Sequence, residues 1–286
     1  MTLSGQEWND LLGEEVAGWG TAGPAAAVVG RAGVLGATGP VGVPRRWASV
    51  TKIVAALAVL DVVHEGLLDL EEPAGPPGST VRHLLAHASG LAFDEPRVQA
   101  APGTRRIYSN AGIDLVTELA CGRTPGKDVA TLLQDRVLGP LRMTGTTLQG
   151  PASHGAVGPV EDLARLASEL LQPQVLRSGI VEQAVTPTFP ELAGVLPGFG
   201  RQSPNDWGLG VELRGNKAPH WTSPTLSPDA FGHFGQSGAF LWIDPSLGLG
   251  LVAATETAFG PWAVQAWPKT SDRVLAGSAV LDERSS

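Results

Sequence analysis

The chain has 286 residues, of which 43% are hydrophobic, enough for one large domain or two interleaved ones. Its formal net charge is -8 and it has no run of Lys or Arg, so neither nucleic acid nor a membrane is expected as a partner. Residues 1–19 lack the basic and apolar regions of an export signal, and no window approaches the about 20 apolar residues of a membrane span, which predicts a cytoplasmic protein.

The first forty residues predict a helix followed by a β-hairpin. Ser4, Gln6 and Glu7 indicate a capping box, and one helical face then carries apolar side chains, namely Trp8, Leu11, Leu12, Val16 and Trp19. Two short apolar runs, 25–29 and 34–37, are joined by a Gly-rich turn and are typical of adjacent antiparallel strands.

The middle of the chain predicts mainly helices. Residues 48–68 are apolar on nearly every side up to Asp61, which indicates a helix in the interior. Further helices are expected at 81–87, 111–121, 129–137 and 161–171, each ended by Pro or Gly clusters. The single cysteine, Cys121, excludes an internal disulfide and is expected on a buried helix face.

The last third returns to strand patterns, at 207–213, 238–243 and 248–255, before a closing helix at about 271–281. We therefore expect an α+β fold whose antiparallel sheet combines N- and C-terminal segments and is flanked by the terminal helices. Residues 1–47 and 205–286 would form this sheet lobe, and 48–204 a mainly helical lobe. The two lobes would make one interleaved catalytic unit with a cleft between them.

Ser49 and Lys52 form a Ser-x-x-Lys pair at the start of the most apolar helix. Residues at i and i+3 share a helix face, so the amine can reach the hydroxyl and, if burial lowers its pKa, accept its proton. The alternative is a Ser cap followed by a solvated lysine. Lysine is rare in this chain, and none of the others, Lys127, Lys217 and Lys269, has Ser three residues earlier.

Tyr108 and Asn110 form a Tyr-x-Asn directly before a predicted helix. The phenol of Tyr108, the only tyrosine, would pass a proton between Ser49 and the leaving group, and Asn110 would hold Lys52 and the substrate. The alternative is that Ser109 or Asn110 caps the helix and Tyr108 packs beside it.

A Gly-rich segment at 232–238, which contains His233, Phe234, Gly235 and Gln236, leads into a predicted strand. Glycines beside a strand allow a substrate to approach closely, and the N–H groups of Gln236 and Ser49 would form an oxyanion hole. The alternative is an ordinary Gly-rich turn before a hairpin.

These three elements occur in the order found in class C β-lactamases, DD-peptidases and related esterases, and the chain resembles that serine β-lactamase-related family. The likeness extends through 47–52, 80–91, 102–110, 138–143, 207–211 and 232–255. It implies a β-lactamase/transpeptidase-like, penicillin-binding fold with Ser49 as the acylated nucleophile and Lys52 and Tyr108 as the proton-transfer pair. Asn110, His233 and Gly235 would line the site.

Departures from the family pattern affect the expected substrate. The third motif is His-Phe-Gly where β-lactamases of this group have Lys-Thr-Gly, so a fixed cation for a substrate carboxylate is replaced by an imidazole, as in some DD-peptidases and D-aminopeptidases. Phe234 would add an apolar wall, and Arg201 and Arg214 are the remaining candidate carboxylate binders. The chain is also short between Leu91 and Pro102.

We therefore expect a cytoplasmic serine hydrolase, an esterase or amide hydrolase that acts on a small acyl substrate. Alternatives are a non-catalytic ligand-binding protein on the same fold, an acyltransferase, or DD-peptidase-like or β-lactamase activity. No cofactor and no metal are expected: His83 and His87 stand at i and i+4, but no Glu follows His83 as a zinc-protease motif requires. The sequence does not define the oligomeric state.

Overall fold

The computed structural model describes residues 3–279 and begins with α1, Gly5–Ala17. Both bonds of the capping box are present, because the Glu7 N–H donates to Ser4 Oγ (3.3 Å) and the Ser4 N–H donates to Glu7 Oε2 (2.6 Å). Trp8, Leu12 and Val16 are buried along one face. The predicted start and apolar face of this helix are thus confirmed.

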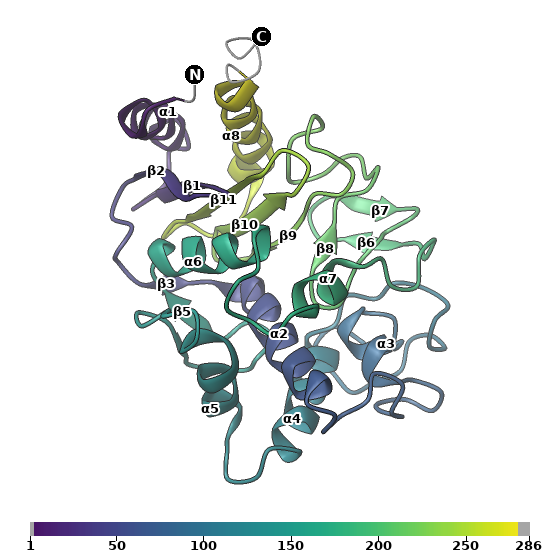
Figure 1. The fold of residues 1–286 in the computed structure, drawn as a ribbon. Helices are drawn as coiled ribbons and strands as arrows, with labels where there is room; N and C mark the ends of the chain where they lie inside the picture. The colour runs from purple at the N-terminus through teal and green to yellow at the C-terminus, as the bar shows by residue number, and fades with distance from the viewer. Residues whose placement is uncertain (1–2, 280–286) are drawn as a thin grey trace.

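A six-stranded antiparallel sheet forms the centre of the upper part of the molecule (Figure 1), in the order β2-β1-β11-β10-β9-β8. Its strands are β1 (Ala25–Gly30), β2 (Gly33–Thr38), β8 (Glu212–Leu213), β9 (Phe231–Gly235), β10 (Ala239–Asp244) and β11 (Leu249–Ala254). β1 pairs with β11, Ala25 opposite Ala254, so the two ends of the chain meet in one sheet. The predicted α+β architecture is confirmed.

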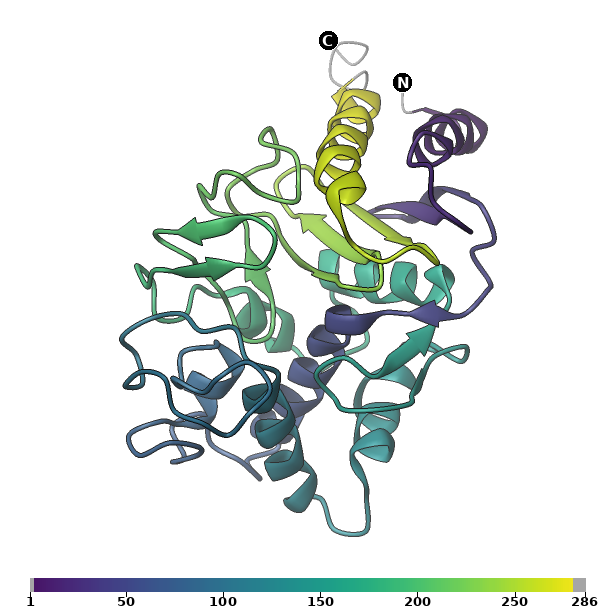
Figure 2. The ribbon, with the colours of Figure 1, turned by 180° about the vertical axis from the view of Figure 1, so that it is seen from behind.

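Helices cover both faces of this sheet, and alternate strand residues supply the two cores. Ala26 and Val28 of β1 point into an aromatic-rich core under α1 and α8 (Pro261–Ala279). Ala25, Ala27 and Val29 point to the opposite core, which contains α2 (Thr51–His64) and α6 (Val160–Leu171). In Figures 1 and 2, α1 and α8 lie on one side of the sheet and α6 and α2 on the other.

The remaining elements surround α2, which runs through the helical part of the molecule (Figure 1). The helices are the 3-10 turn Ala48–Val50, α3 (Val81–Leu85), α4 (Asn110–Gly122), α5 (Val129–Leu133) with a π-helical turn at Gln134–Leu138, and α7 (Ile180–Val185). Short strands form two small sheets: β3 (Arg45–Arg46), β5 (Ala156–Gly158) and β4 (Thr147–Leu148) in one, β6 (Gly194–Leu196) and β7 (Gly200–Gln202) in the other. The division into lobes at 47/48 and 204/205 stays a prediction.

Several predicted boundaries are wrong for identifiable reasons. Helix α2 ends at His64 instead of residue 68 because Gly66 has a φ of +73°, which ends the helix with a left-handed residue. Helix α8 begins at Pro261, ten residues earlier than predicted, and accommodates Pro268 in its interior. Its predicted end at Leu281 lies outside the described residues. Cys121 is half-buried rather than buried, and its thiol donates to the carbonyl of Lys127.

The predicted strand at 207–213 is mostly wrong. The Gly-rich segment that was expected only to lead into a strand forms a strand itself, β9. Only Glu212–Leu213 are in the sheet, because the chain turns back on itself and Trp207 pairs with Glu212 across an isolated bridge. Gly210 has a φ of +78°, and a Cβ there would lie 2.1 Å from Ala56 Cβ on α2. A tight turn packed on α2 therefore occupies this segment.

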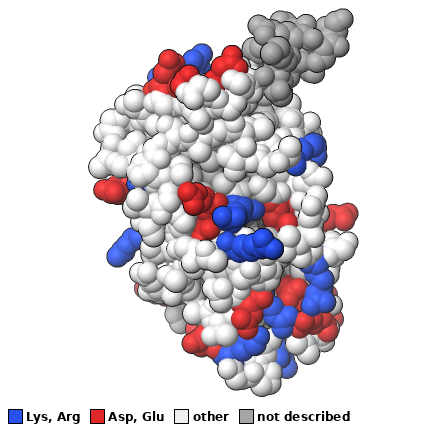
Figure 3. Space-filling view, turned by 60° about the vertical axis from the view of Figure 1, so that its left-hand side comes forward, with Lys and Arg blue, Asp and Glu red and all other residues white. Residues whose placement is uncertain are grey.

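Several charged side chains on the surface form ion pairs. Arg136 and Arg177 each contact both Asp61 of α2 and Glu65, the residue directly after this helix. Figure 3 shows basic and acidic side chains lying next to one another on the face that it presents. Among the described residues, no helix combines the length and the apolar character needed to cross a bilayer.

Candidate active site

Ser49 lies in the 3-10 turn Ala48–Val50 that leads into α2, beneath β9. Ala48, directly before it, has a φ of +46°, a left-handed conformation that is strained for a residue with a side chain and is common beside functional groups. The N-cap of α2 is Val50, and no side chain caps this helix. The hydroxyl of Ser49 is therefore not a helix cap, and that alternative interpretation is wrong.

Lys52 is fully buried one turn later, and its Nζ makes three polar contacts. It lies 2.6 Å from Asn110 Oδ1, 2.8 Å from the Ser153 carbonyl oxygen and 3.3 Å from Ser49 Oγ. Burial lowers the pKa of this amine to about 7, against an opposing effect of the carboxylates of Asp114 and Asp94. A substantial share of Lys52 is thus neutral at physiological pH, as a proton acceptor must be.

The contacts of Lys52 also orient its lone pair. A neutral amine has two N–H donors and one lone pair, and the two closest neighbours, Asn110 Oδ1 and the Ser153 carbonyl, are acceptors only. They occupy both N–H groups, which leaves the lone pair for the remaining neighbour, the Ser49 hydroxyl. This arrangement would allow Lys52 to accept a proton from the Ser49 hydroxyl.

Tyr108 lies on the other side of Ser49, at the start of α4. Ser109 caps this helix by accepting the Gly112 N–H (3.0 Å), so the cap is the central residue of the Tyr-Ser-Asn motif. Asn110 is thereby left for Lys52, whose Nζ also lies 4.7 Å from the centroid of the Tyr108 ring. Burial raises the pKa of the Tyr108 phenol far above its usual range, so the hydroxyl is protonated at rest.

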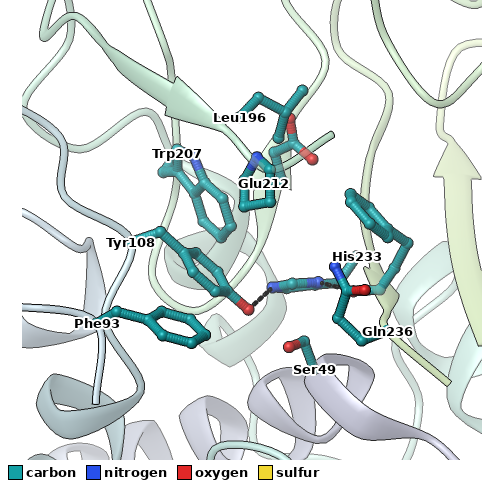
Figure 4. A pocket seen from close by; sticks show the side chains of 10 residues that line it. Ser49, Phe93, Tyr108, Leu196, Trp207, Glu212, His233 and Gln236 are labelled. Carbon is teal, nitrogen blue, oxygen red and sulfur yellow. Dashed lines mark hydrogen bonds between the residues drawn. The ribbon is translucent and has the colours of Figure 1, made fainter. Parts of the chain in front are cut away.

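His233 lines the cavity, as predicted, and also contacts Tyr108 (Figure 4). Its Nδ1–H donates to the Phe234 carbonyl at 2.7 Å, which leaves Nε2 unprotonated to accept the Tyr108 hydroxyl at 3.3 Å. Burial, together with the nearby Lys52, lowers the pKa of His233 to about 3. The position therefore holds a neutral imidazole at physiological pH.

Gly235 permits the close approach of β9 to the nucleophile. A Cβ at this position would lie 2.2 Å from the Trp47 carbonyl oxygen and 3.2 Å from the Ser49 nitrogen. Gln236 follows directly and lines the cavity above Ser49. The assignment of the Ser49 and Gln236 N–H groups as an oxyanion hole stays a prediction.

A cavity lies at Ser49 and is walled mainly by aromatic and aliphatic side chains (Figure 4). It is lined by Ser49, Phe93, Tyr108, Leu196, Pro197, Trp207, Glu212, His233, Phe234 and Gln236. Of the predicted site residues, Asn110 reaches the site through Lys52, and Gly235 contributes close packing. Arg201 and Arg214 are not in this lining, and Arg214 donates to backbone carbonyls of residues 215, 223 and 224.

Three groups at the site were not identified from the sequence. The Ser153 carbonyl, on the loop before β5, is a backbone atom and carries no sequence signal. Glu212 is buried at the end of the cavity with Lys217, His220 and Trp221 as partners, and its segment showed only strand character. Asp94 accepts a hydrogen bond from the Asn110 amide. The only sequence signal for Asp94 is its position three residues after Leu91, where the family-like segment 80–91 ends.

Comparisons with known proteins place these features in a family. The model of the Beta-lactamase family matches residues 8–271. A crystal structure of a beta-lactamase (Mb2281c) from Mycobacterium bovis is 48% identical, with a TM-score of 0.91 over 94% of this chain and 99% of that one. EstCE1, a hydrolase with promiscuous acyltransferase activity, shares the fold at 16% identity, with a TM-score of 0.75 over 93% and 98% of the two chains.

A curated relative matches over a shorter stretch. The D-alanyl-D-alanine-carboxypeptidase/endopeptidase AmpH of Escherichia coli (strain K12) is 25% identical over 139 residues, and the match covers 36% of this chain and 36% of AmpH. The chain thus matches little more than a third of that relative's length. Because the family model spans nearly the whole fold and contains the Ser49 site, the chain belongs to the beta-lactamase family, whose members are generally serine hydrolases.

Proposed function

We propose that the protein hydrolyses small uncharged esters through an acyl-enzyme at Ser49. The observation that carries the proposal is the arrangement around Lys52, in which two acceptors occupy both N–H groups of the neutral amine and leave its lone pair for Ser49. A buried amine with a pKa of about 7 is well matched to general-base catalysis near neutral pH.

The proposed reaction has two halves that use the same groups. Ser49 Oγ attacks the carbonyl carbon while its proton moves to Lys52 Nζ, and the N–H groups of Ser49 and Gln236 stabilise the oxyanion. The bond to the leaving oxygen then breaks, the leaving group takes the Tyr108 phenol proton, and Lys52 returns the first proton to the phenolate. Water next attacks the acyl carbon, Lys52 accepts its proton, and Ser49 Oγ regains a proton as the acid leaves.

The composition of the cavity supports an uncharged acyl group. Most of its wall is apolar, and among the residues that line it none is Lys or Arg. His233, at the position where some relatives have a cationic lysine, is neutral, so a substrate carboxylate would lose its hydration there without gaining a counter-charge. EstCE1, which shares this fold, is described as a hydrolase with promiscuous acyltransferase activity, and acyl transfer is the chemistry proposed for Ser49.

Hydrolysis of β-lactams is the second candidate, favoured by the 48% identity to the Mycobacterium bovis protein that is described as a beta-lactamase. The two candidates differ in whether a carboxylate is tolerated beside the scissile carbonyl. We would compare p-nitrophenyl acetate with a chromogenic cephalosporin on the same preparation. A larger kcat/KM for the cephalosporin would replace the esterase proposal with the β-lactamase one.

The acyl-enzyme itself is tested by labelling with a fluorophosphonate probe and intact-mass spectrometry. The wild type should gain one adduct, and Ser49→Ala should gain none and lose turnover of short p-nitrophenyl esters. Ser246→Ala is the matched control, because Ser246 is an exposed serine at the β10–β11 turn whose hydroxyl donates to Asp229. Turnover that persists in folded Ser49→Ala would refute the proposal, and one adduct without turnover would indicate the non-catalytic binding protein.

A further inference from the structure

We propose that Asp94 is a positioning residue of this site: its carboxylate fixes the Asn110 side chain so that the amide oxygen, and not the amide nitrogen, faces Lys52. The inference rests on the proposed function, in which Lys52 is the base for Ser49. Asp94 lies in the loop after Leu91 and is not among the residues that line the cavity, and its carboxylate orients the site through its hydrogen bond with Asn110.

The contacts define a chain of three side chains. Asn110 Nδ2 donates to Asp94 Oδ1 at 2.7 Å, and Asn110 Oδ1 accepts from Lys52 Nζ at 2.6 Å. Asp94 is exposed, but the two residues before it are held against the start of α4 by backbone contacts. The Ser109 hydroxyl donates to the Ala92 carbonyl at 2.7 Å, and the Asn110 N–H donates to the Phe93 carbonyl at 2.7 Å.

Reversal of the Asn110 amide would disable the base. The NH₂ group would then face Lys52 and donate to the amine, which would occupy the lone pair that Ser49 needs. A donor next to the amine also disfavours its protonated form, whereas the amide oxygen stabilises that form. Asp94 prevents the reversal because a carboxylate accepts hydrogen bonds and has no donor for the amide oxygen.

The charge of Asp94 acts on the same amine in a definite direction. The titratable groups that face or influence Lys52 come from several elements: Asp114 on α4, Asp94 on the loop, Tyr108 before α4, His87 after α3 and His233 on β9. The two carboxylates raise the pKa of Lys52 against the effect of burial. Asp114 also receives the N–H and the hydroxyl of Ser153, whose carbonyl is the second acceptor for Lys52.

Two substitutions separate the charge from the orientation. Asp94→Asn removes the charge but keeps an oxygen that accepts from Asn110, and Asp94→Ala removes both. Titration of the lysine side chains, labelled with ¹³C at Cε, follows each pKa by NMR whether or not the enzyme turns over. The chain has only four lysines, Lys52, Lys127, Lys217 and Lys269, and the Lys52 signal is identified by its loss in Lys52→Met.

The expected order of the Lys52 pKa is wild type, then Asp94→Asn, then Asp94→Ala as the lowest. Loss of the charge alone should lower it, because the Asp94 carboxylate raises the pKa of Lys52. In Asp94→Ala, the Asn110 amide is also free to reverse, which should lower the Lys52 pKa further. That variant should also lose about tenfold in the maximal rate of fluorophosphonate labelling, the effect of one weakened catalytic contact, and Asp94→Asn should keep most of this rate.

Glu95→Gln is the matched control, because Glu95 is the adjacent exposed carboxylate, pairs with Arg97, and does not touch Asn110. Equal pKa values in Asp94→Asn and Asp94→Ala would overturn the positioning role, as would Lys52 pKa values no different from those of Glu95→Gln. Failure of wild-type labelling would refute the proposed function instead. The order of the Lys52 pKa values measured by NMR would still decide the role of Asp94.

Discussion

Replacement of Lys52 by methionine should change how the stability of the protein depends on pH. The pKa of this lysine falls from 10.5 in an unfolded chain to about 7 in the fold. Between these values the unfolded chain binds one more proton than the folded protein, so the free energy of unfolding rises as the pH increases. The destabilisation from burying Lys52 is therefore complete below about pH 7 and is relieved as the pH approaches 10.5.

The two pKa values give the size of the effect. Between pH 7 and pH 9 the wild type should gain about 2 kcal/mol of unfolding free energy from Lys52 alone, since each pKa unit corresponds to about 1.4 kcal/mol. Lys52→Met keeps a similar volume without an ionisable group, so it should lack this gain. Urea unfolding followed by circular dichroism at pH 7 and pH 9 provides the four free energies for the comparison.

The double difference isolates Lys52, because all other groups titrate in both proteins. Lys269→Met is the control, since this lysine is exposed on α8, and it should retain the wild-type pH dependence. An equal gain between pH 7 and pH 9 in the wild type and in Lys52→Met would show that Lys52 is not held neutral by burial. The general-base assignment would then lose its physical basis.

Three other substitutions test the packing around the site. Gly235→Ala should push β9 away from the Trp47 carbonyl and slow fluorophosphonate labelling at least tenfold, a typical cost of a displaced oxyanion donor, which labelling kinetics would show. Arg106→Ala should lower the unfolding free energy by about 3 kcal/mol in urea melts, because three buried backbone carbonyls and a partly buried one lose a charged donor. Glu212→Gln should cost about 3 kcal/mol by leaving the buried ammonium of Lys217 without a counter-charge, and adding Lys217→Met should recover part of this loss in thermal melts.

The elements that the sequence predicted well have strong local signals. The capping box at Ser4 specifies the start of α1, and a segment that is apolar on all sides specifies the buried helix α2. Ser49, Lys52 and Tyr108 were identified because each belongs to a short motif at fixed spacing, and the structure brings them together. The chemical roles proposed for them are the subject of the labelling experiments.

The errors occur where long-range packing overrides local pattern. The segment Phe231–Gly235 contains two glycines and a histidine, which disfavour a strand, but it pairs with β10 and lies against the turn that carries Ser49. Conversely, residues 207–211 belong to a predicted strand but form a tight turn, in which Gly210 packs closely against Ala56 of α2. Neither contact partner lies near these segments in the sequence.

The same limit applies to the supporting groups of the site. The Ser153 carbonyl is 101 residues from Lys52 in the chain, and any residue type supplies a carbonyl. Asp94 is an exposed acidic residue among several in its loop, and only the fold brings its carboxylate to the Asn110 amide. Motifs therefore reveal the reacting groups, whereas the groups that orient them emerge from tertiary structure.

The proposed activation of Ser49 therefore depends on the assembled fold. On an isolated helix, Lys52 would be solvated and protonated at neutral pH, with no lone pair for the Ser49 hydroxyl. Burial lowers its pKa, and two acceptors from separate segments, Asn110 on α4 and Ser153 before β5, then direct the remaining lone pair. A substitution that loosens either segment without touching Ser49 should therefore remove the reactivity of Ser49 before it unfolds the protein. This reactivity requires all three contacts of Lys52, whereas the stability of the fold does not.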